Sequence, residues 1–381
     1  MKEQLSDKNI RIEYLPCINY AMSVNGAKYL GSCELTNDDD CDWRELTVRL
    51  TGEFIATSEA VIDLIPQGQT VSISGLAIKP DVEKLRQLTE SVDTTFTLQV
   101  SNGGNVLLSS SHSVRLMAID EWPGIGVMPE LLAAFVTPNA PETAQVRINA
   151  AKQLERLTGS SSLDEYQTQD PNRVRAQVAS VYEALRGESL VYCAPPASFE
   201  KSGQRIRLMN QLLTQKLGTC ADLSLAFATC LESMGLHPLL IISEGHMFVG
   251  CWLVDKYYPQ IIFDDLSFLT KSIADGINEI VVVEATCLTM KNMPFEKAVS
   301  EAEKHLYQTP DEFIMAVDVY RCRLDGIRPL PLKNSDDVAE GIDLDHATES
   351  IKEQRQYDLQ GSDTRQLTRQ QIWERKLLDF S

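Results

Sequence analysis

The 381-residue sequence lacks several features that would assign it to common protein classes. Its first ten residues contain no apolar stretch of the kind found in a secretion signal. The longest apolar runs, such as residues 238–242 and 280–283, fall far short of the roughly 20 residues that span a membrane. No GxxxxGK[ST] phosphate loop occurs. We therefore expect no contact with a membrane and no ATP hydrolysis by this chain alone.

The cysteines are also arranged in a way that argues against disulfide and zinc-ribbon sites. The nine cysteines are odd in number and scattered, and none forms a CxxC pair. Without a secretion signal, this pattern predicts reduced thiols in a cytoplasmic protein, with neither a disulfide framework nor a zinc ribbon. We expect no metal and no cofactor.

The charge balance argues against direct binding of nucleic acid by this chain. There are 54 acidic and 35 basic residues, for a formal net charge of -19. Such a surface repels phosphate backbones. The chain is 43% hydrophobic, which is enough apolar material for two or three globular domains.

The first third of the sequence predicts strands. Near-alternating apolar residues occur in four segments, and Ser101 to Asn105 has the composition of a hairpin turn. Strands at this spacing favour an immunoglobulin-like antiparallel β-sandwich, which we assign to residues 1–118, with a short helical excursion at residues 80–88. The predicted strands are residues 9–24, 43–54, 70–78 and 94–100.

The pattern then changes to that of an α+β domain, which we assign to residues 119–332. Helical spacing of apolar residues precedes three strand-like runs, and two more helices follow. The remaining residues, 333–381, are polar and charged and predict a linker and the start of a further module. The predicted helices are residues 131–135, 144–157, 173–185, 206–217, 220–234, 295–306 and 310–324, and the strands are 238–243, 247–254 and 279–285.

Cys220 is placed where a cysteine nucleophile would be expected. Thr219 is a good helix N-cap, and Asp222 three residues later completes a capping-box pattern. Cys220 then occupies the first helical position, where free backbone N–H groups and the helix dipole favour the thiolate. The backbone N–H of Cys220 is also suitably placed to donate to an oxyanion, with the side chain of Gln204 as a second candidate.

A nucleophilic cysteine needs a base and a group that orients the base. His246 opens an apolar strand that we expect to pack beside the start of the cysteine helix. For the third member, Glu284 lies in one strand-like run, while Asp264 and Asp265 follow another. The two aspartates would also serve as the cap of a following helix, so the choice stays open here.

These residues resemble the transglutaminase-like cysteine peptidase superfamily. The shared order is a cysteine at a helix start, a histidine opening a strand, and an acid before a threonine on the next strand. Residues 282–286, VVEAT, match the family's acidic strand with Glu in place of Asp. The resemblance implies a transglutaminase/papain-like fold with Cys220 as nucleophile, His246 as base and Glu284 as orienting group. The His246-to-Glu284 separation is longer than usual and implies an insertion at residues 255–278.

A narrower resemblance covers most of the chain from about residue 19. It is similar to the N-terminal region of large bacterial helicase-related proteins, often associated with phage-defence loci, that carry a transglutaminase-like domain. The matching segments are PPASFE (195–200), GQRIR (203–207), GTCAD (218–222), GHMFVG (245–250), GINE (276–279) and WERKLLD (373–379). The resemblance implies that helicase or nuclease modules act with this chain, in cis or in trans.

Together these features predict a thiol hydrolase or acyltransferase that acts on a peptide or protein substrate. The alternative is a catalytically inactive recognition module that regulates a nucleic-acid motor, because members of such superfamilies can keep the fold and lose the chemistry.

Overall fold

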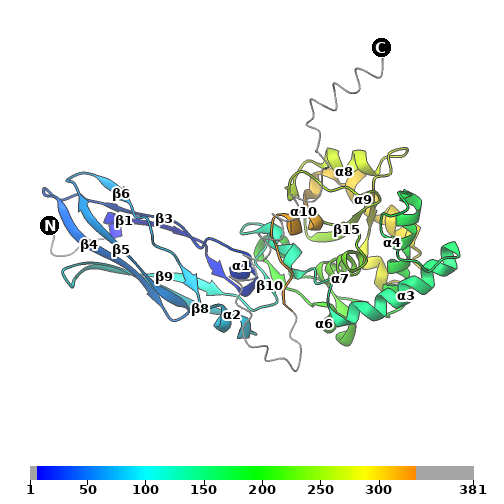
Figure 1. Ribbon diagram of the computed structural model, residues 1–381, viewed down its shortest axis with the longest axis horizontal. Coiled ribbons are helices and arrows are strands. Elements are labelled where there is room, and N and C mark those ends of the chain that lie inside the picture. Colours follow the sequence, from blue (N-terminus) through cyan, green and yellow to red (C-terminus); the bar gives the residue numbers. More distant parts are fainter. Residues whose placement is uncertain (1–6, 332–381) are drawn as a thin grey trace, which may run out of the picture. The chain divides into compact units, whose positions relative to one another are not determined.

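The computed structural model describes residues 7–331, which form a mixed α+β fold with several sheets (Figure 1). Residues 7–331 belong to one compact unit. The division between residues 118 and 119 therefore stays a prediction, and the predicted linker of residues 333–381 lies outside the described residues. Across residues 7–331, no helix is both long and apolar enough to cross a membrane.

The N-terminal third is built from two sheets, as its alternating pattern predicts. In β8, for example, Phe96, Leu98 and Val100 are buried while their neighbours are more exposed. Buried residues of both sheets belong to one apolar cluster. The six-stranded sheet has the order β2 (Cys17–Ile18), β9 (Asn105–Leu116), β8 (Val92–Asn102), β4 (Trp43–Gly52), β5 (Ile55–Ile65), β7 (Lys79–Pro80), and the three-stranded sheet has the order β1 (Ile10–Tyr14), β3 (Leu30–Thr36), β6 (Thr70–Ser72).

Three local predictions in this third have different outcomes. The hairpin turn is confirmed, because Asn102 pairs with Asn105 where β8 meets β9. The helical excursion is also present as α2 (Val82–Gln87). The single strand expected over residues 9–24 is wrong, because its last part is the helix α1 (Tyr20–Val24). The Asn19 side chain caps this helix by accepting from the Met22 N–H, a local bond that competes with a strand ladder.

The second region contains a five-stranded sheet with the order β16-β18-β14-β15-β17. Its neighbouring strands all pair antiparallel, and the central strand β14 and its neighbour β15 are almost entirely buried. The strands are β14 (Pro238–Ser243), β15 (His246–Trp252), β16 (Ile262–Phe263), β17 (Ile280–Val283) and β18 (Phe313–Asp318), and two short pairs join β10 (Glu121–Trp122) to β12 (Gln204–Arg205) and β11 (Val191–Tyr192) to β13 (Leu217–Gly218).

The helix expected over residues 310–324 is wrong in its middle. The 3-10 turn η4 (Pro310–Glu312) leads into β18, and only then does α10 (Val319–Leu324) begin. Residues 313–317 are a short apolar run that fits a buried strand and a buried helix equally well. Pairing with β14 on one side and β16 on the other decides the outcome.

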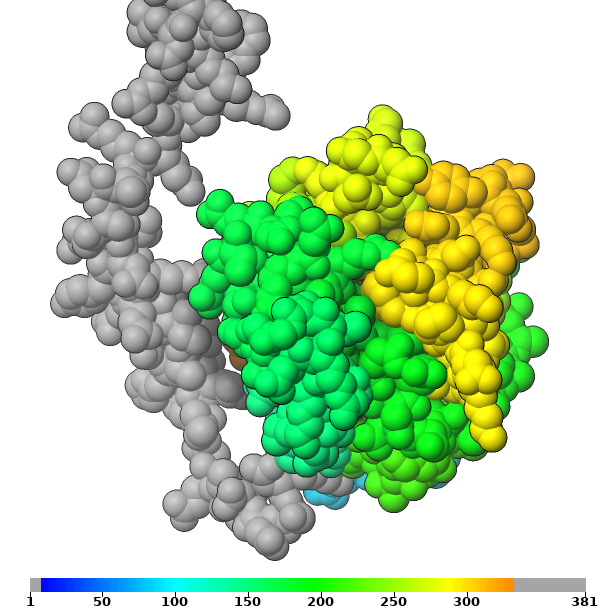
Figure 2. All heavy atoms as spheres, turned by 90° about the vertical axis from the view of Figure 1, so that its right-hand side faces the viewer, coloured from blue at the N-terminus to red at the C-terminus, as the bar shows by residue number. Residues whose placement is uncertain are grey.

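Helices pack around this sheet and hold the site in place. The helix α7 (Cys220–Ser233) lies against β15 (Figure 1), and the 13-residue helix α9 (Phe295–Tyr307) packs on β17. Figure 2 shows the face on which α3 and α4, blue-green to green, lie beside the yellow-to-orange segment that contains α9. The remaining helices are η1 (Asp7–Asn9), η2 (Pro129–Phe135), α3 (Pro141–Thr158), α4 (Pro171–Arg186), α5 (Phe199–Ser202), α6 (Met209–Gln215), α8 (Leu266–Ile273) and η3 (Ala285–Thr289).

Candidate active site

The start of α7 is fixed by a complete capping box. The Thr219 hydroxyl accepts from the Asp222 N–H at 3.3 Å, and the Asp222 carboxylate accepts from the Thr219 N–H at 2.9 Å. Asp222 is fully buried and also accepts from the backbone N–H and the guanidinium of Arg207. Cys220 is therefore held at the first position of the helix, as the sequence predicts.

Burial opposes the preference for a thiolate that the helix start gives to Cys220. Cys220 is 0% exposed, and burial raises the pKa of its thiol to about 12. Backbone hydrogen bonds with Met247 and Ala221 lower the pKa, while the charge of Glu284 raises it further. The helix N-terminus favours the thiolate by a smaller amount than burial disfavours it, so the resting thiol is protonated at neutral pH.

The structure brings His246 and Glu284 together. His246 is the first residue of β15, and Glu284 follows directly on β17, the strand paired with β15. Their side chains meet at 2.7 Å between His246 Nε2 and Glu284 Oε2. The next residue after His246, Met247, is the one whose backbone contacts Cys220. His246 therefore uses one ring nitrogen for Glu284 and keeps Nδ1 for a second partner.

The two oxygens of Glu284 have separate roles. Oε1 caps η3 by accepting from the backbone N–H of Thr286 at 2.9 Å and from its hydroxyl at 2.7 Å. Oε2 faces His246 and also a second histidine, His305, whose Nε2 lies 3.3 Å away. The capping bonds thus fix the carboxylate with one oxygen directed at two imidazole rings.

Sequence reasoning missed His305. It lies on α9, seven residues or about two helical turns after Ala298. The carbonyl of Ala298 accepts a hydrogen bond from the Glu284 N–H. That spacing puts it on the helix face that packs on β17, which is the signal that was available. Its ring lies 4.8 Å from the ring of His246 and is stacked on Phe248 at 5.5 Å between centroids.

The electrostatics of this cluster follow from its contacts. Burial alone would raise the pKa of Glu284, but hydrogen bonds from His246 and His305 lower it to about 2. The same carboxylate raises the pKa of His305. Glu284 is therefore ionised throughout the physiological range, as a group that orients a histidine should be.

The two aspartates offered as alternatives to Glu284 lie elsewhere. Asp264 is exposed, and Asp265 caps α8 by accepting from the Ser267 N–H at 2.8 Å. Within residues 7–331, no hydrogen bond or ion pair joins either aspartate to His246. The geometry of Asp265 matches the helix-capping interpretation.

Gln204 lies beside the start of α7. Its Nε2 donates to the Thr219 hydroxyl at 3.3 Å, one residue before Cys220. Its Oε1 is buried and has no hydrogen-bond partner among residues 7–331. The N–H of Cys220 itself has no acceptor available within the helix, because it belongs to the first turn. Both predicted oxyanion donors thus lie at the same helix end.

Tyr192, which the sequence reasoning did not single out, lies at the edge of the site. The strand β11, which contains Tyr192, pairs parallel with β13. The strand β13 ends two residues before Cys220. Burial raises the pKa of Tyr192, and the charges of Cys220 and Glu284 add to the rise. Its side chain is partly exposed, as is that of Val191.

The other described histidines have different surroundings. His237 is buried and stacks on Tyr320 with 3.8 Å between ring centroids, while its Nδ1 contacts the carbonyl of Lys256 at 2.9 Å. His112 lies on β9, where its ring stacks on Phe96 and contacts Ser110. His346 lies outside the described residues. His246 and His305 are therefore the two that share a buried carboxylate.

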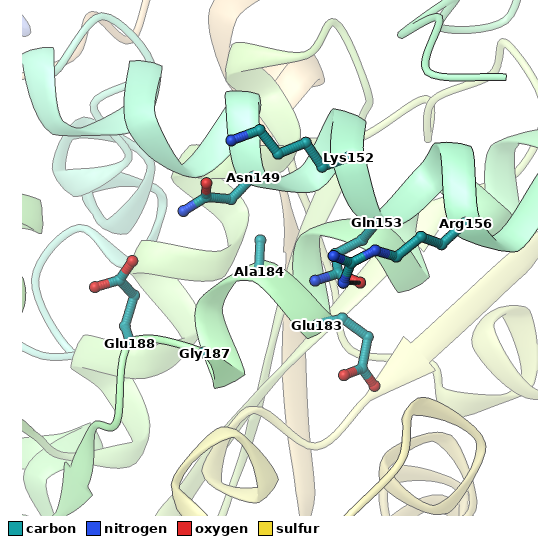
Figure 3. Close-up of a pocket in the computed structure, with 8 residues that line it drawn as sticks. All are labelled: Asn149, Lys152, Gln153, Arg156, Glu183, Ala184, Gly187 and Glu188. Carbon is teal, nitrogen blue, oxygen red and sulfur yellow. Dashed lines mark hydrogen bonds between the residues drawn. The ribbon is translucent and has the colours of Figure 1, made fainter.

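A surface pocket between α3 and the end of α4 is separate from this cluster (Figure 3). Lys152 and Arg156 come from α3, while Glu183 and Glu188 come from the end of α4 and the turn after it. A different hollow lies closer to the site, where Val191 of β11 meets residues 288–292. That hollow has a mixed lining, in which the exposed apolar side chains of Val191 and Met290 lie among polar and charged residues such as Arg186 and Lys291.

Comparisons with known proteins do not assign the chain to a family. No family model matches the sequence, and no curated protein matches it. One solved structure that is similar in part is that of a "putative protease" from Parabacteroides distasonis ATCC 8503. The match has a TM-score of 0.21 and 13% identity, and it covers 69% of this chain and 47% of that one. We draw nothing from similarity at this level.

Proposed function

We propose that this protein is a thiol hydrolase or acyltransferase of the transglutaminase-like kind, with Cys220 as nucleophile, His246 as base and Glu284 as orienting group. The observation that carries the proposal is the 2.7 Å bond between His246 Nε2 and a buried carboxylate on the neighbouring strand. That bond fixes the ring with a proton on Nε2, which leaves Nδ1 free as a base.

The reaction follows the usual course of acyl transfer. Cys220 Sγ attacks the carbonyl carbon of a peptide or amide while its proton passes to His246 Nδ1. The oxyanion that forms is stabilised by the Cys220 N–H and by the amide of Gln204. The C–N bond then breaks, and the leaving amine takes the proton from His246. Water or a second amine attacks the thioester, gives its proton to His246 and regenerates the thiol.

The raised pKa of Cys220 determines how the first step proceeds. Burial raises the pKa of the Cys220 thiol, which disfavours a preformed thiolate at neutral pH. We propose that proton transfer to His246 accompanies the attack of sulfur, as it does for a serine nucleophile. We propose that substrate approaches past Tyr192 and the hollow beside Val191, where exposed side chains lie next to the site.

The rest of the chain fits the same proposal. We propose that residues 1–118 form an immunoglobulin-like sandwich and residues 119–332 a transglutaminase/papain-like domain. By the resemblance of the sequence, such a module would serve a helicase-related protein, with a role in phage defence. Its substrate would then be a peptide or protein rather than the nucleic acid that the motor handles.

One observation favours a second candidate, an inactive recognition module. Cys220 is fully buried and its thiol is protonated, which is also what a cysteine kept only for packing would show. In this case the cluster around Glu284 would stabilise the fold, and substitutions on the surface would disrupt function more than loss of the thiol.

A matched pair of cysteine variants separates the two candidates. Cys220 and Cys230 lie on the same helix and both are fully buried. A peptide library derived from digested protein is incubated with each variant and a fluorescent amine, and mass spectrometry records cleavage and amine incorporation. We expect Cys220→Ala to abolish both products and Cys230→Ala to retain them. Products that persist in Cys220→Ala would end the proposal.

A further inference from the structure

The cluster around Glu284 also has the composition of a metal site. One ligand atom from each of His246, Glu284 and His305 lies within 4.8 Å of the other two. The two shortest separations are 2.7 Å and 3.3 Å, both to Glu284 Oε2. The side chains are 20%, 5% and 35% exposed, in that order, so an ion would enter from the side of His305.

Two imidazole nitrogens and one carboxylate oxygen form a donor set that suits zinc. Zinc sites with three protein ligands keep a fourth position for water, at bond lengths of about 2.0–2.2 Å. Ligand atoms in such a tetrahedron lie about 3.3 Å apart. The separation is 3.3 Å for His305 and Glu284 and 2.7 Å for His246 and Glu284, and the three ligand atoms all lie within 4.8 Å of one another. Small movements of the two rings would therefore make room for an ion between the three donors.

The surroundings hold the donors in the required orientation. Both hydrogen bonds of Thr286 engage Glu284 Oε1, which leaves Oε2 directed at the rings. Phe248 lies beside both rings and restricts their rotation. In metal sites, hydrogen bonds from residues that do not bind the ion themselves commonly orient the ligands in this way.

We propose that His246, Glu284 and His305 bind a divalent ion of the zinc class, and that the bound ion switches off the chemistry of Cys220. The second part rests on the proposed function. An ion on His246 Nε2 occupies the lone pair that is formed when Nε2 loses its proton, so the neutral ring must carry its proton on Nδ1. Nδ1 then donates a hydrogen bond and no longer accepts the proton of the thiol.

Metal binding is tested without reference to activity. The full chain is titrated with Zn²⁺ in competition with a chromogenic chelator, and separately with Co²⁺ while visible absorption is recorded. We expect one tight site, whose affinity falls at least tenfold in His305→Gln, and tetrahedral Co²⁺ bands without a thiolate charge-transfer band. The control is His112→Gln, which removes a histidine on β9 and should bind Zn²⁺ like the wild type.

The outcomes separate the metal site from the thiol chemistry. Equal affinity in the wild type and His305→Gln, or a thiolate charge-transfer band, would overturn the metal site. If Zn²⁺ binds as expected and thiol-dependent products form equally with Zn²⁺ or with EDTA, the inhibitory role is wrong. If Zn²⁺ binds as expected and Cys220→Ala has the same products as the wild type, the proposed function fails while the metal site stands.

Discussion

Two buried carboxylates lie at the ends of two strands of the same sheet, and each caps the helix that follows its strand. Glu284 follows β17 and caps η3, and Asp318 ends β18 and caps α10. In each, one oxygen accepts from backbone two or three residues ahead. The other oxygen differs. That of Asp318 accepts from the indole of Trp252 and the N–H of Tyr258, whereas that of Glu284 faces His246 and His305.

The difference shows what separates a structural carboxylate from a functional one. The donors at Asp318 are an indole and a backbone N–H, which neither titrate near neutral pH nor change tautomer. Its hydrogen bonds therefore serve only to hold the strand, the indole and the loop together. The donors at Glu284 are rings that change tautomer and charge. Burial raises the pKa of Asp318, and its hydrogen bonds do not reverse this, while the pKa of Glu284 is lowered to about 2.

The largest expected effect is on activity, and it separates the two carboxylates most sharply. Replacing Glu284 with Gln removes the charge that orients His246, so we expect the thiol-dependent rate to fall by about 10²–10⁴. Asp318→Asn should leave the rate unchanged at temperatures where the variant is folded. Initial rates with a peptide found in the library screen measure both. Equal losses in the two variants would contradict the distinction.

The loss of unfolding free energy should be larger in Asp318→Asn than in Glu284→Gln, which is the opposite of the order expected for activity. An amide at position 318 places N–H donors against the fixed donors of Trp252 and Tyr258, at a cost of about 3 kcal/mol. At position 284 the imidazoles can change tautomer and accept from the amide, so the cost should be about 1 kcal/mol. Urea unfolding of Asp318→Asn and Glu284→Gln at pH 7, with EDTA present, measures the difference. A greater loss in Glu284→Gln would contradict this reasoning.

The pH dependence of stability should have opposite signs at the two sites. The pKa of Glu284 is lowered from 4.5 to about 2, so its stabilisation is present above pH 4.5 and is lost as the pH falls toward 2. The pKa of Asp318 is raised from 3.8, so its contribution is present below pH 3.8 and is lost as the pH rises through the folded-state value.

Unfolding free energies at pH 3 and pH 6 test these signs. Between pH 6 and pH 3, the disadvantage of Glu284→Gln relative to wild type should shrink, and that of Asp318→Asn should grow. Changes of the same sign in both variants would show that the two environments do not differ as described.

The smallest expected effect concerns the capping oxygen of Glu284. Thr286→Val keeps the backbone N–H but removes the hydroxyl that donates to Oε1 at 2.7 Å. We expect a loss of about 1 kcal/mol in the free energy of unfolding, because one hydrogen bond is lost. Thr286→Ser retains the hydroxyl and is the matched control. No difference between the Val and Ser variants would show that this hydroxyl does not hold the carboxylate.

Much of the site could be predicted because its signals are local. The capping box around Cys220 and the strand opened by His246 are each encoded within a few residues, and the structure has both. The sequence could not separate Glu284 from Asp264 and Asp265 as the orienting group. The pairing of β15 with β17, which the sequence does not specify, brings Glu284 to His246.

The missed features depend on contacts between distant segments. His305 reaches Glu284 because α9 packs on β17, and β18 is a strand because it pairs on both sides. The effect of burial on Cys220 depends on distant segments in the same way. The helix end is visible in the sequence, but the burial that raises the pKa comes from elements far along the chain.

The central claim is that His246 removes the proton of a protonated, buried Cys220 thiol during attack. The most direct measurement is the rate at which p-nitrophenyl acetate acylates each cysteine. Peptide mass spectrometry follows this rate for each residue in the wild type and in His246→Ala. The exposed Cys41 is the internal reference. We predict that acylation of Cys220 falls at least about a hundredfold in the variant while that of Cys41 is unchanged. Equal acylation of Cys220 in both proteins, or acylation confined to Cys41, would contradict the claim.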